Sequence, residues 1–143
     1  MGYLEAHIEQ GCYLEEANEK IGIVTAIVGI RGLIISFKGE QNHAGTTTMK
    51  RRKDAATAMF ETAYRINTQF PRLARETTVW TLGNAVVEPG ASSIVPGAAE
   101  LTLQFRDQDE SILDALEQEV KKIVEDIRSR GEILVDVRPG REV

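Results

Sequence analysis

The sequence is poor in the residues that build disulfides and self-contained metal sites. Its 143 residues include one cysteine, Cys12, and two histidines, His7 and His43. A single cysteine excludes a disulfide within the chain, and no cluster of cysteine and histidine is present to hold a structural metal. Two histidines are too few for a self-sufficient multi-histidine centre. The fold must therefore be stabilised by the packing of a hydrophobic core.

Long apolar runs and excess positive charge are also missing. No run approaches the roughly 20 apolar residues that cross a bilayer, and the N-terminus lacks the basic-then-apolar order of a secretion signal. The 17 basic and 22 acidic residues give a formal net charge of -5, which disfavours nucleic acid and anionic lipid as partners. We therefore expect a cytoplasmic protein that binds neither nucleic acid nor membrane.

The first patterned stretch runs from Ile21 to Lys38 and is rich in β-branched residues. Such residues favour extended strands, and the two glycines within the stretch, Gly29 and Gly32, favour a bend between them. The stretch therefore predicts two strands, near residues 22–28 and 32–39.

Helical and extended patterns alternate through the rest of the chain. Apolar residues recur at helical spacing from about Lys50 to Pro71, and again after Asp109 or Ser111, either of which can cap a helix that ends before Gly131. Extended patterns predict three more strands, at 77–87, 99–106 and 133–137. Counted from the second strand, the order β-α-β-β-α-β predicts an α+β ferredoxin-like sandwich, a four-stranded antiparallel sheet with two helices on one face.

Two polar clusters interrupt these patterns. The first is EAHIEQG, residues 5–11, and a histidine among carboxylates near a chain end is typical of a solvated surface. The second is QNHAGTTTM, residues 41–49, between a predicted strand and a predicted helix. Thr47 or Thr48 could cap that helix. From the residues alone, the first cluster favours a surface feature, and the second leaves a helix cap and a functional site equally open.

A resemblance to a known family joins the two clusters. The chain resembles the zinc-dependent amidohydrolases that include N-carbamoyl-amino-acid hydrolases, β-ureidopropionases and allantoate amidohydrolases. The resemblance keeps order and spacing through four runs: YLEAHIEQG, IGIVTAIVGIRG, GEQNHAGTTTMKRRKDAA and SSIVPGAAELTLQFRD. Its most specific block is NHAGTT followed by Met49, Arg52, Asp54 and Ala55. The match covers about residues 3–110, and the last helix and strand complete the family's lid domain.

The resemblance implies a two-domain subunit that hydrolyses a linear C–N amide or ureido bond. Residues 1–28 would be a remnant of the catalytic domain with a hinge strand, and 29–143 the ferredoxin-like lid and dimerisation domain. The homodimer would form through the edge strand at 77–87. The complete enzyme would hold two zinc or manganese ions, and His7 is the one matching metal ligand here. We therefore expect the chain alone to bind no metal pair and to be inactive.

The resemblance also implies roles for individual side chains. His43 matches a lid histidine that reaches into the partner subunit's active site and stabilises the negative charge of the transition state. Arg106 matches an arginine whose planar fork of donors pairs with a substrate carboxylate. Gln10 and Asn42 match substrate contacts. Ser93 stands where many members have an asparagine that contacts substrate, which leaves the substrate open among N-carbamoyl amino acids, allantoate and similar compounds.

The alternative is an autonomous ferredoxin-like module that binds or senses a small molecule. Such a module would leave residues 1–20 without a purpose. A nucleic-acid-binding sandwich would in addition need exposed aromatic residues on its sheet, whereas the outward positions of the third strand are Glu100, Thr102 and Gln104. The fold alone does not decide between the two, because ferredoxin-like domains serve many functions.

Overall fold

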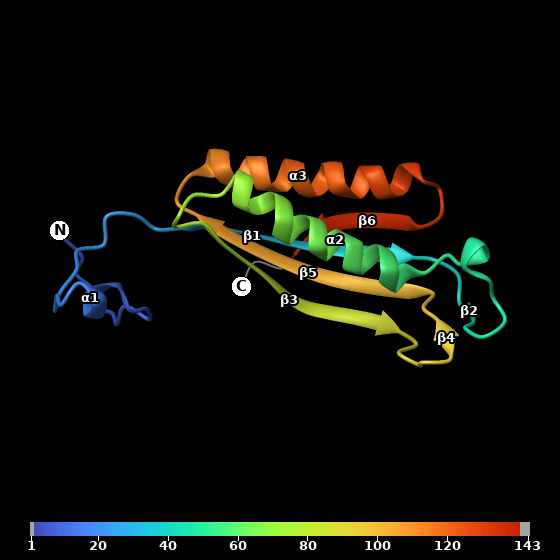
Figure 1. Cartoon of the computed structure of the whole chain (residues 1–143). Helices are drawn as coiled ribbons and strands as arrows, with labels where there is room; N and C mark the ends of the chain where they lie inside the picture. The colour runs from blue at the N-terminus through green and yellow to red at the C-terminus, as the bar shows by residue number, and fades with distance from the viewer. Residues whose placement is uncertain (1, 141–143) are drawn as a thin grey trace.

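A four-stranded antiparallel sheet forms the centre of the computed structural model, which describes residues 2–140 (Figure 1). The strand order is β3-β5-β1-β6, and both long helices, α2 and α3, lie on one face of the sheet (Figure 1). The predicted ferredoxin-like sandwich is confirmed, with β3 at one edge. The bounds are β1 Gly29–Lys38, α2 Ala55–Gln69, β3 Val79–Glu88, β5 Ala98–Asp107, α3 Glu110–Ser129 and β6 Leu134–Pro139.

Alternation along the two central strands explains which face of the sheet is buried. From Leu33 in β1 and from Ala99 in β5, every second side chain points toward the helices and is almost fully buried. Each such leucine or phenylalanine contributes about 1.5–3 kcal/mol by leaving water. The buried side chains of these strands include Leu33, Ile35 and Phe37 of β1, and Leu101, Leu103 and Phe105 of β5.

The long helix α3 begins where the sequence predicts. The Asp109 side chain accepts a hydrogen bond from the Ser111 amide at 2.9 Å, so Asp109 is the N-cap. Gly131, with a positive φ of 72°, follows the helix end. The buried residues of α3 recur along one face, which lies against the sheet: Leu113, Leu116, Val120, Ile123, Val124 and Ile127.

Helix α2 begins later than predicted. It starts at Ala55, capped by Asp54, whose carboxylate accepts from the amides of Ala56 at 3.0 Å and Thr57 at 3.1 Å. A short 3-10 turn, η1 (Met49–Arg51), precedes it, and the backbone of Arg52 is extended. An extended residue interrupts the helical hydrogen bonds, so neither Thr47 nor Thr48 caps α2, and the helix-cap interpretation that was left open for this loop is not borne out. The helix ends at Gln69 and is followed by a second 3-10 turn, η2 (Phe70–Arg72), which contains Pro71.

The predicted strand at 22–28 is not formed. The only regular element of residues 2–28 is the single-turn helix α1 (Tyr13–Glu16), and Ile21, Ile23 and Ile27 are each more than 80% exposed. A strand needs a neighbour for its backbone hydrogen bonds, and this segment has none within residues 2–140. The β-branched pattern predicted the strand but could not supply a pairing partner.

Beyond one end of the main sheet lies a second, two-stranded sheet that the sequence did not predict (Figure 1). It consists of β2 (Asn42–His43) and β4 (Ile94–Val95).

In the part of the chain that the structure describes, no helix has the length and apolar character needed to span a membrane.

Asp107 is a buried carboxylate where β3, β5 and α3 meet. It is 1% exposed, and it accepts hydrogen bonds from the Thr78 hydroxyl and from the Asp109 amide, the latter at 2.8 Å. Both hydrogen bonds favour the charged form, and the one from the Thr78 hydroxyl has the larger effect. They hold the pKa of Asp107 below its usual range despite burial. The hydrogen bond between Thr78 and Asp107 therefore stabilises this junction as long as the carboxylate is ionised.

We expect Thr78→Val to lower the free energy of unfolding by about 1–3 kcal/mol at pH 7, because the buried carboxylate loses a hydrogen-bond donor. A carboxylate with a depressed folded pKa stabilises the fold above its unfolded pKa, about 3.9, and loses that contribution as the pH falls through the folded pKa. The deficit of the variant should therefore shrink in acid. Urea unfolding at several pH values measures it, with the exposed neighbour Thr77→Val as control. A deficit that is independent of pH would contradict this role of Asp107.

Candidate functional site

Two loops meet at the end of the sheet where β2 pairs with β4. Asn42 lies opposite Val95 and His43 opposite Ile94. The Ala44 amide donates to the Ser93 carbonyl at 2.8 Å. Val95 is 1% exposed, and the carbonyl of the next residue, Pro96, accepts from the Ala55 amide at 3.1 Å, which links this small sheet to the start of α2. The pairing brings together His43 and Ser93, which are far apart in the sequence and were both predicted as site residues.

The His43 imidazole is exposed and has a defined hydrogen-bonding state. Its Nδ1 accepts a hydrogen bond from the Gly45 amide at 3.1 Å. A ring nitrogen that accepts carries no proton, so the neutral ring carries its proton on Nε2. Nε2–H is thus the donor that His43 offers to a partner or substrate.

Asn42 makes a different contact. Its amide donates to Glu40 Oε1 at 3.2 Å, and Glu40 lies 3.6 Å from Lys53 Nζ. The Asn42 amide first, and then the Lys53 charge, lower the pKa of Glu40. Neighbouring residues of a strand point to opposite sides. Accordingly Asn42 lines a polar hollow of about 490 Å³ that His43 does not line, so the structure does not place the amide beside the imidazole.

Arg52 holds the loop from the inside and was not among the predicted site residues. Its Nη2 donates to the Ala44 carbonyl at 2.6 Å and its Nε to the Thr47 carbonyl at 3.1 Å. The sequence signal that could have found it is its place shortly after the NHAGTT block, but no spacing rule reveals a side chain that bonds to backbone carbonyls.

Arg106 lies at the opposite end of the main sheet. It sits on β5 across from Ile30 and Val79, and the side chain is exposed. Its guanidinium donates twice to Gln104 Oε1, at 2.8 and 3.1 Å. The strand from Ala98 to Arg106 spans roughly 27 Å at ~3.4 Å per residue. Within one chain, Arg106 therefore cannot share a small substrate with His43.

The N-terminal segment lies at the Arg106 end, where Gly29 pairs with Asp107 (Figure 1). His7 and Gln10 are exposed in this segment. Within residues 2–140 no group of three or more histidine, cysteine, aspartate or glutamate side chains is arranged to hold a metal ion. The described residues therefore do not fit a two-metal centre, and His7 could be at most one ligand of a site completed elsewhere.

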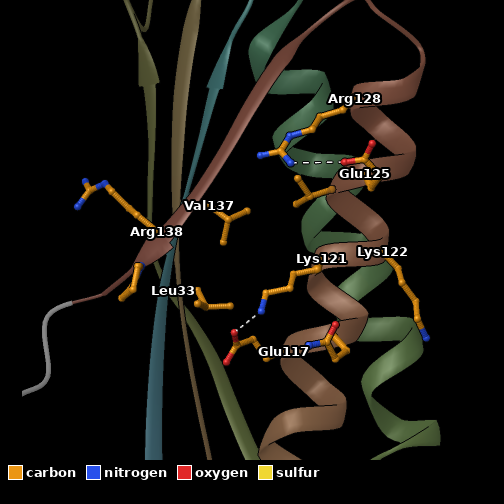
Figure 2. A pocket seen from close by; sticks show the side chains of 11 residues that line it. Leu33, Glu117, Lys121, Lys122, Glu125, Arg128, Val137 and Arg138 are labelled. Atoms are coloured by element: carbon orange, nitrogen blue, oxygen red, sulfur yellow. Dashed lines mark hydrogen bonds and ion pairs between the residues drawn. The ribbon is translucent and has the colours of Figure 1, made fainter.

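A groove of about 680 Å³ lies between α3 and β6, near the edge of the sheet away from β3 (Figure 2). Leu33 and Val137 line its floor, and cations and carboxylates line its sides. These charges are paired with each other: Lys121 with Glu117 at 2.7 Å and Arg128 with Glu125 at 3.4 Å (Figure 2). An autonomous small-molecule module would use such a groove. None of the predicted site residues lines it, and its cations are already neutralised.

The fold and the placement of polar residues define an α+β domain that carries separate groups of candidate residues at the two ends of one sheet. A family model described as "Peptidase dimerisation domain" matches residues 25–132. The chain belongs to this family.

Its relatives are amidohydrolases. The chain is 37% identical over 135 residues to an N-carbamoyl-L-amino-acid amidohydrolase of Paenarthrobacter aurescens, covering 94% of the chain and 32% of the relative. It is 34% identical over 125 residues to an allantoate amidohydrolase of Bacillus subtilis, covering 87% and 30%. A crystal structure of a hydantoinase/carbamoylase family amidase from Burkholderia phymatum matches with a TM-score of 0.87 at 41% identity, over 95% of this chain and 34% of that one. The chain thus spans about a third of the length of these relatives.

Proposed function

We propose that the chain is the lid and dimerisation domain of a metal-dependent hydrolase that cleaves a linear C–N amide or ureido bond. The substrate would be an N-carbamoyl amino acid, allantoate or a similar compound, and the chain would be inactive without a catalytic domain. One observation carries the proposal: His43 and Arg106 lie at opposite ends of a sheet whose long edge, β3, is open. The names of the relatives support the reaction class.

The open edge of the sheet has the character of a dimer interface. Among residues 2–140, strand β3 has β5 as its one neighbour in the sheet, so its outer backbone groups can pair with another strand. The adjacent face of α2 exposes two aromatic side chains one turn apart, Phe60 at 61% and Tyr64 at 69%. Asn67 on the same face accepts from Trp80 Nε1 at 2.9 Å, which ties this face of α2 to β3. Apolar side chains next to an open strand favour a second copy of the chain as the occupant.

Antiparallel pairing of two β3 strands about a twofold axis has a geometric consequence. It places the Val79 end of one strand beside the Glu88 end of the other. Val79 is the neighbour of Arg106, and Glu88 is the neighbour of Ala98, at the end where β2 and β4 lie. The Arg106 of one subunit would then face His43 of the partner subunit. Two complete sites would form only in the dimer.

The side chains suit the proposed roles. His43, with the proton on Nε2, would donate to the substrate carbonyl oxygen as that oxygen gains negative charge. Arg106 would pair with a substrate carboxylate through its two parallel donors, in exchange for Gln104. Ser93 lies beside His43 and would contact the same substrate. Gln10 and Asn42 would be further polar contacts, and His7 would be a metal ligand within the catalytic domain.

We expect Phe60→Asp to convert the dimer to a monomer, because a buried aromatic contact would be replaced by a charge that must be desolvated. Light scattering coupled to gel filtration at micromolar concentration measures the mass. Leu134→Asp is the matched control, because Leu134 is 72% exposed on β6 at the opposite edge of the sheet. A wild-type monomer, or a Phe60→Asp dimer as stable as wild type, would contradict the proposed interface.

In the complete hydrolase, His43→Ala should lower kcat roughly 100-fold while KM changes much less, since the lost donor acts mainly in the transition state. Steady-state kinetics on an N-carbamoyl amino acid and on allantoate would measure both parameters. Thr48→Ala, an exposed change in the same loop, is the control. If His43→Ala keeps full kcat, the catalytic role of this residue must be withdrawn.

A further inference from the structure

The loop that follows β2, residues 44–47, is short, and hydrogen bonds hold both of its ends. At its start the Ala44 amide is bonded to the Ser93 carbonyl. At its end the Thr47 amide donates to the His43 carbonyl at 3.1 Å, which closes a turn. The backbone that carries His43 is therefore bonded to the rest of the domain on both sides, although the imidazole itself is exposed.

Gly45 lies directly against the His43 ring. Its amide is the donor to Nδ1, and a Cβ added at Gly45 would lie 3.1 Å from His43 Cε1 and 3.4 Å from Nδ1. Any larger residue would press on the imidazole. The glycine thus permits the ring to lie over the turn, and its N–H selects the form of the ring that is protonated on Nε2.

Arg52 fixes the same turn from the other side. Its guanidinium is half-buried and spans the carbonyls of Ala44 and Thr47, one from each end of the loop. A planar fork of donors can reach two such acceptors at once, whereas a lysine ammonium reaches them as a single point. Because the Gly45 amide lies between the two carbonyls, its direction depends on where Arg52 holds them.

We propose that Arg52 is a positioning residue for His43. It holds the 44–47 turn so that the Gly45 N–H stays on Nδ1 and the proton of His43 stays on Nε2, ready to be donated. This inference rests on the proposed role of His43 in the hydrolase, and it adds the residue that sets the tautomer and position of that donor.

The first experiment uses the 143-residue chain and needs no activity. Imidazole ¹⁵N chemical shifts report which His43 nitrogen carries the proton, and amide hydrogen exchange reports on the Thr47 bond. In wild type we expect the Nε2–H form. Arg52→Met should mix the two tautomers and speed Thr47 exchange at least tenfold, Arg52→Lys should be intermediate, and Gly45→Ala should displace the ring without freeing Thr47. Arg51→Met is the control, since it removes the same charge from an exposed neighbouring residue.

The second experiment uses the complete hydrolase. Arg52→Met should lower kcat about 10- to 100-fold with little change in KM, as expected when a catalytic donor is misplaced by about an ångström. In a His43→Ala background the same change should cause no further loss, because Arg52 acts through His43. Arg51→Met should keep wild-type kcat. Arg52→Lys provides a milder variant if Arg52→Met does not fold.

The outcomes distinguish a failure of the proposed function from a failure of the positioning role of Arg52. If His43→Ala is fully active, the proposed function fails. A tautomer change in Arg52→Met would still establish that Arg52 positions the His43 ring. If His43→Ala is inactive but Arg52→Met and Arg52→Lys keep wild-type tautomer, exchange and kcat, the positioning role is overturned. Equal losses in Arg51→Met and Arg52→Met, or a further loss in the double variant, would also overturn it.

Discussion

The antiparallel pairing of β1 with β5 is the constraint on which the rest of the structure depends. It runs without interruption from Gly29 opposite Asp107 to Lys38 opposite Ala98. Because side chains alternate along paired strands, this register puts one set of apolar side chains under both helices. Within residues 2–140, the other face of the sheet has no helix over it and mixes polar side chains with exposed apolar ones such as Ile30 and Val79. It also sets the distance between the two ends of the sheet, and each end carries one group of candidate residues.

In the proposed dimer, neither group of residues forms a site alone. Strand β5, which spans roughly 27 Å from Ala98 to Arg106, separates the two groups, and the open β3 edge runs along that length. A second copy that pairs antiparallel with β3 would place the His43 end of one subunit beside the Arg106 end of the other. In the proposed dimer, the same strand would serve stability inside the domain and alignment of the two half-sites. That arrangement would account for polar residues at loops and strand ends and not in a closed pocket.

The sequence predicts most of the fold because the fold is built from strong periodic patterns. Buried apolar residues recur with a period of 3.6 in helix α3, which Asp109 caps, and with a period of 2 in strand β5. The apolar pattern alone therefore predicts both elements. The β2–β4 sheet could not be predicted, since two-residue strands leave no periodicity. The start of α2 at Ala55 was missed, although Asp54 before it is a typical N-cap residue. The candidate residues came from a resemblance, and Arg52 was missed because its partners are backbone carbonyls, which a sequence does not display.

Subunit complementation tests the shared site most directly. His43→Ala and Arg106→Ala subunits of the complete hydrolase are each expected to be nearly inactive as homodimers. After mixing and exchange, half of the dimers pair one variant with the other, and each of these has one intact site, formed by Arg106 of one subunit and His43 of its partner. The account predicts recovery to about a quarter of wild-type activity. Activity no higher than that of the separate variants, at verified subunit exchange, would contradict a site shared across the dimer.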